Sequence, residues 1–98
     1  MSDEDERRTL ELLEANHVFP GEFHFTVIAR NDESVTAAIV LSIEAGLGAP
    51  LAEAAREIRL SSGGKYVSHR LTVPCATAAD VVRLFAGVRR VDGVMTVL

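Results

Sequence analysis

The stretch EIRLSSGGKYVSHRLTV, residues 57–73, decides the fold. Within it, two runs of alternating apolar and polar residues flank the sequence Ser62-Gly63-Gly64-Lys65. Because a glycine pair between alternating runs favours a tight turn, the stretch predicts a β-hairpin. The second strand, residues 66–73, has the clearer alternation and stops before Pro74. The first strand lies within residues 53–62, after an irregular entry.

The residues on each side of the hairpin predict one further strand and one helix. Residues 22–30 alternate between two faces and predict a strand, and residues 34–46 carry apolar side chains at helical spacing. After the hairpin, residues 78–90 repeat the helical spacing behind Thr77, which caps a helix when an acid follows three positions later. Residues 94–98 predict a short final strand.

This β-α-β-β-α-β order predicts an α+β fold, the ferredoxin-like split β-α-β sandwich, in which a four-stranded antiparallel sheet carries two helices on one face. The fold occupies residues 21–98, and residues 1–20 form an acidic N-terminal tail and a short helix over residues 7–15. The strand residues expected to face the helices are Phe23, Phe25, Val27, Leu71, Val73, Val94 and Leu98. Those expected on the open face are His24, Thr26, Ile28, Glu57, Arg59, Tyr66, Ser68, Arg70, Thr72, Met95 and Val97.

The charge of the chain is concentrated at its start. Residues 1–14 carry the whole formal net charge of −4, so the remaining residues are neutral overall. Since a neutral body lacks the basic surface that neutralises phosphates, and Tyr66 is the one aromatic expected on the open face, we expect no nucleic-acid partner. The longest apolar run, residues 37–41, is far shorter than the ~20 residues of a membrane span. The acidic start is unlike a secretion signal, so we expect a cytoplasmic protein with no membrane partner.

Few residues could carry chemistry. His17, His24 and His69 lack metal-ligand spacing, and the last two are expected on opposite faces of the sheet. The lone Cys75 excludes an internal disulfide and a multi-cysteine zinc site, and we interpret it as a small core residue. Ser62-Gly63-Gly64-Lys65 joins two strands rather than a strand and a helix, which favours a hairpin turn over a phosphate cradle. We therefore predict no catalytic residues, no metal and no cofactor, and a protein that is not an enzyme.

Three patterns in the chain occur together in one known family. The start contains Leu12-Leu13-Glu14, Phe19-Pro20 and Phe23-x-Phe25-x-Val27. The hairpin reads Ser61-Ser62-Gly63-Gly64-Lys65-Tyr66-Val67-Ser68, and the chain ends Val94-Met95-Thr96-Val97-Leu98. Over about residues 10–98 these patterns resemble the YbeD-like family of bacterial proteins, a domain of unknown function. The resemblance implies a ferredoxin-like fold related in shape to ACT regulatory domains, and it implies no activity.

The open sheet face is the best candidate for a functional surface. Tyr66, Ser68 and Arg70 share this face on one strand, and Arg59 lies on the neighbouring strand. A tyrosine and two arginines among polar and apolar residues are typical of a binding interface. We expect an unknown protein or a small metabolite to bind there, which describes a regulatory or binding module. The alternative is a purely structural or protein-interaction adaptor without a small ligand.

Self-association is a further expectation from the sequence. A homodimer would use the open sheet face or the outer face of the helix over residues 34–46, where Val40 and Leu41 lie off the predicted core. The N-terminal residues Leu10, Leu13 and Phe19 offer an internal cover for one of these surfaces instead.

Overall fold

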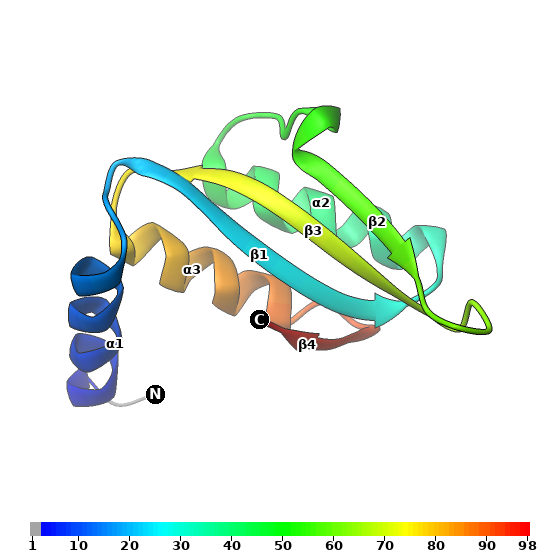
Figure 1. The fold of residues 1–98 in the computed structure, drawn as a ribbon, viewed down its shortest axis with the longest axis horizontal. Coiled ribbons are helices and arrows are strands. Elements are labelled where there is room, and N and C mark those ends of the chain that lie inside the picture. The colour runs from blue at the N-terminus through cyan, green and yellow to red at the C-terminus, as the bar shows by residue number, and fades with distance from the viewer. Residues whose placement is uncertain (1–2) are drawn as a thin grey trace.

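The structure, a computed structural model, describes residues 3–98. Its elements, in chain order, are α1 (Asp3–Asn16), β1 (Gly21–Arg30), α2 (Glu33–Leu47), the 3-10 turn η1 (Glu53–Ala55), β2 (Arg56–Leu60), β3 (Tyr66–Cys75), α3 (Ala78–Arg89) and β4 (Val94–Val97). The strands form one antiparallel sheet in the order β2-β3-β1-β4. Both α2 and α3 lie on one side of it (Figure 1). The predicted α+β, ferredoxin-like architecture is confirmed.

The core lies between the sheet and these two helices. On β1 the side chains of Phe25, Val27 and Ala29 are buried, and on β3 Leu71 and Val73 are buried with them. The intervening residues of both strands are exposed or half-buried. This period of two confirms that one sheet face packs against the helices and the other is open.

The helix α2 begins and ends at identifiable caps. Asp32 accepts a hydrogen bond from the backbone N–H of Ser34 at 2.8 Å, and Gly48 ends the helix with a left-handed φ of 69°. The sequence predicts an end over Gly46, Gly48 and Pro50, and Gly48 is the residue that ends the helix, whereas Gly46 lies inside α2. A Cβ at Gly46 would collide with the side chain of Leu84 on α3, so this glycine allows the two helices to pack closely.

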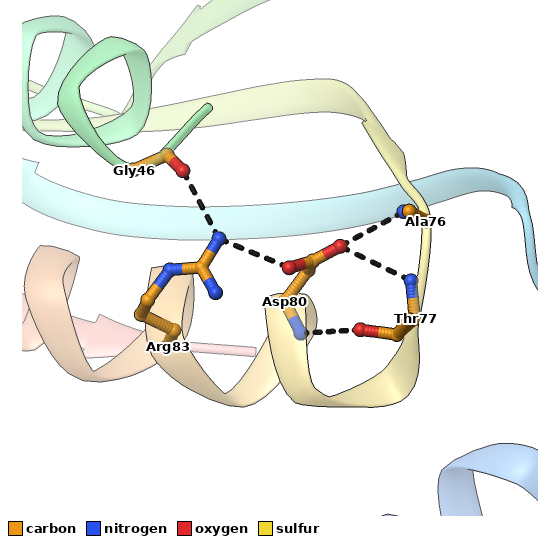
Figure 2. Close-up of polar contacts among 5 residues, drawn as sticks. All are labelled: Gly46, Ala76, Thr77, Asp80 and Arg83. Carbon is orange, nitrogen blue, oxygen red and sulfur yellow. Dashed lines mark hydrogen bonds and ion pairs between the residues drawn. The ribbon is translucent and has the colours of Figure 1, made fainter. Parts of the chain in front are cut away.

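The start of α3 is fixed by Asp80 (Figure 2). Its carboxylate accepts the backbone N–H groups of Ala76 and Thr77 at 3.0 and 3.1 Å, and Thr77 Oγ1 accepts the Asp80 N–H at 3.3 Å, which is the predicted capping box. The other carboxylate oxygen lies 3.0 Å from Arg83, which donates to the Gly46 carbonyl at 3.0 Å. Burial alone would raise the pKa of Asp80, but the bonds from Thr77, Arg83 and Ala76 together lower it. The cluster ties the start of α3 to the end of α2.

The last strand corrects the predicted assignment of faces. Val97 is buried and Leu98 is exposed, whereas the alternation of the sequence placed Val97 on the open face and Leu98 inward. The pairing of β4 with β1 contains a register shift, so Ala29 pairs with Val94 and Val27 with Val97. Both valines therefore face the helices, because the bulge interrupts the period of two.

The strand β3 is longer than the sequence predicts. It continues through Pro74 to Cys75, although a proline cannot donate to a strand ladder. The pairing between β2 and β3 ends at Arg56 and Leu71, so Pro74 pairs with β1 alone. A proline is tolerated here because one side of β3 has no neighbouring strand.

The N-terminal helix lies beside the start of α3 and does not cover the open sheet face (Figure 1). It begins at Asp3, four residues before the predicted start, so the acidic residues form its first turn, where negative charge is favourable. Leu13 and Phe19 pack against the edge of the core instead, so they do not form the internal cover of the open sheet face expected as one alternative, and Leu41 on the outer face of α2 remains 64% exposed.

Candidate functional site

Two rows of paired residues on the open face bring most of the predicted site together. Arg59 of β2 pairs with Ser68 of β3, and Ser68 pairs on its other side with Ile28 of β1. These side chains lie on the same face of the sheet, because residues that pair across antiparallel strands point to the same side. Arg59 and Ser68 are therefore neighbours, as the sequence predicted for the open face.

The second row lies beside the first. Glu57 of β2 pairs with Arg70 of β3, which pairs with Thr26 of β1. Together the two rows surround a hollow of about 480 Å³ in the open face. Its lining residues are Thr26, Glu57, Ile58, Arg59, Ser68 and Arg70. An adjoining hollow of about 400 Å³ shares Thr26, Glu57 and Arg70 and continues towards His24 and Thr72.

The hollow carries more positive than negative groups. Within residues 3–98 the ion pairs are Arg30 with Asp32 and Arg83 with Asp80, so neither Arg59 nor Arg70 has a carboxylate within 4.0 Å. Both guanidinium groups belong to exposed side chains. Their donors are therefore available to a ligand.

Tyr66 is the one predicted site residue that does not line the hollow. It lies on the same face of β3, at the end next to the hairpin, where it pairs with Arg30 of β1. Its ring is half-buried and lies 5.6 Å from the ammonium nitrogen of Lys65. The structure thus brings Arg59, Ser68 and Arg70 together and leaves Tyr66 outside the group.

Three residues of the hollow, Thr26, Glu57 and Ile58, were not among the predicted site residues, although the first two were predicted on the open face. Glu57 and Thr26 enter the site because they are the two strand partners of Arg70. The alternation within one strand predicts on which face of the sheet a residue lies. Predicting its neighbour on the next strand also requires the register in which the two strands pair. A register argument from the hairpin turn would have found Glu57, since the turn fixes the pairing of β2 with β3.

The two strand histidines lie on opposite faces, as predicted. His24 is exposed on the open face and its Nδ1 lies 3.2 Å from the hydroxyl of Thr72. His69 is only 3% exposed on the helix-covered face, where its strand partners are Val27 and Ile58. Its Nε2 has no hydrogen-bond partner within the described part of the chain, and burial lowers its pKa. This environment favours the neutral ring.

Cys75 lies in an environment typical of a structural residue rather than a reactive one. Cys75 is buried in the core, and burial first and the charge of Asp80 second raise the pKa of its thiol, which holds it in the less reactive protonated form. Among residues 3–98 no cluster of three or more His, Cys, Asp or Glu side chains could hold a metal ion. No helix over the same residues is long and apolar enough to cross a membrane.

The glycine turn is a hairpin turn, as predicted. Gly63 and Gly64 adopt left-handed φ values of 88° and 70°, which are accessible to glycine without strain. The turn is bonded to the loop before α2: the backbone N–H of Asn31 donates to the Lys65 carbonyl at 3.0 Å, and the Asn31 side chain donates to the Gly64 carbonyl at 2.8 Å. Two carbonyls of the turn, those of Gly64 and Lys65, are thus used within the protein.

Comparison with known proteins gives a family and no function. A search of curated proteins finds no match to this chain. One family profile, described as "Protein of unknown function (DUF493)", matches residues 14–98. The match includes the whole sheet and both helices that cover it. The YbeD-like proteins are the known members of this group, so the resemblance found in the sequence is confirmed. The chain belongs to the DUF493 family of proteins of unknown function.

Proposed function

We propose that this protein is a non-enzymatic binding module that takes a small anionic metabolite on its open sheet face. The observation that carries the proposal is the pair Arg59 and Arg70, which come from neighbouring strands to one hollow and have no carboxylate partner among residues 3–98. Guanidinium groups bind carboxylates and phosphates through pairs of parallel N–H donors. Two of them at one hollow favour an anionic group.

The other polar residues of the hollow support the same ligand class. Ser68 lies in the row of Arg59, and Thr26 in the row of Arg70, so each arginine has a hydroxyl beside it. A hydroxyl can both donate and accept, which suits the remaining oxygens of a bound acid. Glu57 offsets one of the two positive charges, so the hollow suits a ligand of low net charge.

The test is a titration of the wild-type chain followed by NMR chemical shifts. Succinate, glutamate, inorganic phosphate and glycerol phosphate are the probes, because they cover carboxylates, an amino acid and phosphates. We expect saturable shifts at the amides of Thr26, Ser68 and Arg70 with at least one of them. The adaptor without a small ligand replaces this proposal if none of the four gives a saturable shift.

Matched variants test the residues. Arg59→Gln combined with Arg70→Gln should weaken binding at least about tenfold, because each charge-assisted hydrogen bond contributes roughly 1.5–3 kcal/mol. Arg8→Gln in α1 removes a positive charge far from the sheet and should bind as wild type does. Tyr66→Ala should also leave binding unchanged, since Tyr66 lies outside the hollow. Equal affinity of the double variant and wild type would place the site elsewhere.

The proposal also makes Cys75 dispensable for binding. Cys75→Ala should reduce stability, because Cys75 is buried in the core, but should leave the titration unchanged. A folded Cys75→Ala protein that no longer binds the probe would return the thiol to consideration as a functional group.

A further inference from the structure

The strand β2 is an edge strand whose outer side is unpaired. The order β2-β3-β1-β4 places it at the margin of the sheet, as Figure 1 shows. Its five residues pair with β3 without any register shift, so the edge is regular. Ile58 and Leu60, on the helix-covered face, are each 59% exposed. A regular edge with exposed apolar side chains is a template for pairing with another strand.

The hydrogen-bond pattern shows which backbone groups of β2 face outward. Ser61 donates its N–H to the Tyr66 carbonyl at 2.9 Å, in the same register as the ladder of β2 and β3. Because these bonds alternate along an antiparallel strand, Glu57 and Arg59 also direct their backbone groups to β3. Arg56, Ile58 and Leu60 therefore direct theirs away from the sheet.

The sequence of this edge complements itself. When two copies of β2 pair antiparallel around Ile58, Glu57 of each copy lies opposite Arg59 of the other. Ile58 then meets its own counterpart, and Leu60 lies opposite the aliphatic stem of Arg56. The outward backbone groups fall into hydrogen-bonded pairs in this register, which supplies about six bonds across the edge.

Neighbouring registers do not give this complementarity. The outward groups lie only on Arg56, Ile58 and Leu60, so the pairing can shift only by steps that keep these residues opposite one another. A shift in one direction places Glu57 opposite Glu57, and a shift in the other places Arg59 opposite Arg59. Like charges directly opposite are destabilising, so the charges select the register centred on Ile58.

We propose that a second copy of this chain binds the β2 edge and forms a two-fold symmetric dimer with one continuous sheet. The same five residues contribute from both copies, which is the self-complementary arrangement that two-fold symmetry requires. Opposed Glu57–Arg59 pairs lie on the open face on both sides of the axis, and the apolar contacts lie on the helix-covered face. Since a five-residue edge is small, the dimer dissociates in the micromolar range.

The dimer is independent of ligand binding but lies next to the proposed ligand site. Glu57 and Arg59 line the hollow, so the hollows of the two copies adjoin across the axis. Arg59 has five N–H donors, and an ion pair with Glu57 of the second copy leaves donors for a ligand. The dimer is measured without ligand, so the two proposals stand or fall separately.

Sedimentation velocity over a range of protein concentrations tests the dimer. Wild type should shift from monomer to dimer as its concentration rises through the micromolar range. Glu57→Arg and Arg59→Glu each place like charges opposite one another, and each should raise the dissociation constant at least about tenfold. Glu22→Arg changes the net charge by the same amount on the open face of β1, and should dimerise as wild type does.

An equimolar mixture of the Glu57→Arg and Arg59→Glu proteins is the decisive sample. Each is repelled by its own copies, but together they restore both opposite-charge pairs, so the mixture should form dimers containing one copy of each. Circular dichroism first establishes that both variants are folded, which is expected because both positions are exposed. A wild type that stays monomeric at high micromolar concentration, single variants that dimerise normally, or a mixture that stays monomeric would each overturn the proposal.

Discussion

The two edge strands of the sheet, β4 and β2, differ in how much of their side-chain surface is buried in the core and in how regularly they pair with their neighbours. At one edge, β4 buries Val97 to 7% exposure and pairs with β1 through a register shift. At the other, β2 has no buried residue and pairs with β3 in a regular ladder. One edge strand therefore contributes to the core, and the other exposes most of its side-chain surface. This comparison shows that an edge that stabilises the fold and an edge that is available for binding can belong to one small sheet.

The difference has a physical cause in the two ladders. A bulge increases the local twist and disrupts the ladder, so β4 is a poor template for another strand. The regular β2 keeps its outward N–H and C=O groups evenly placed. Its charged residues protect it against general aggregation and still permit the one register that pairs unlike charges.

The largest effect is expected at the buried edge. Val97→Asp places an unpaired carboxylate beside Val27 in the core and should lower the free energy of unfolding by about 3 kcal/mol. Met95→Asp is the matched control, because Met95 is on the same strand and 61% exposed, and it should change stability by less than about 0.5 kcal/mol. Urea unfolding measures both, and equal losses would show that β4 does not contribute to the core as described.

The next effect concerns His69, which lies on the helix-covered face of β3 between its strand partners Val27 and Ile58. Burial lowers its pKa below 6.5, so the unfolded chain binds a proton at a pH where the folded chain does not. Stability should fall as the pH drops below about 6.5 through the lowered folded pKa. His69→Leu should flatten this part of the curve of unfolding free energy against pH.

His24→Gln is the control for that measurement, because His24 is exposed on the open face. It should keep the loss of stability at low pH. If His69→Leu retains the full slope, another group is responsible for it.

A smaller effect separates the inner and outer sides of β2. Arg59→Pro removes an N–H that is directed to β3, whereas Ile58→Pro removes one directed to solvent, where edge strands tolerate proline. The first variant should be less stable than the second by about 1 kcal/mol, the contribution of one backbone hydrogen bond. Thermal unfolding at low protein concentration compares them, and the reverse order would contradict the assigned direction of the backbone groups.

The smallest effect on folding is expected from the exposed apolar residues of β2. Ile58→Thr combined with Leu60→Thr places β-branched threonine at both positions and should lower the stability of the monomer by less than about 1 kcal/mol. The same change should raise the dissociation constant of the dimer about tenfold, because it removes the apolar contacts across the axis. A loss of several kcal/mol in the monomer would show that β2 contributes to the core as β4 does.

Local patterns in the sequence predicted the parts of the fold that depend on neighbouring residues. The capping box of Thr77 and Asp80 spans four residues, and the glycine turn at Gly63 and Gly64 lies between two alternating runs, so both could be found without knowing the tertiary structure. The element order and the fold class followed from these signals together with the alternating and helical spacings of the other segments. The face of Val97 could not be found in this way, because it depends on a bulge between two strands far apart in the chain.

The candidate site shows the same limit. Arg59, Ser68 and Arg70 were placed on one face by alternation, and the structure brings them to one hollow. Tyr66 shares that face but is the first residue of its strand, next to the turn, and the pairing of three strands shows that the hollow lies farther along the sheet. Of the glycines predicted to end the second helix, Gly48 does so, whereas Gly46 lies inside the helix because it leaves room for the side chain of Leu84 on α3.

The two hydrogen bonds from Asn31 have a mechanical consequence. They attach the loop that begins α2 to the tip of the hairpin, the same hairpin whose strands carry the edge and the two arginines. The tip of the hairpin and the start of α2 are therefore joined directly, outside the core, in addition to the pairing of Arg30 with Tyr66 in the sheet.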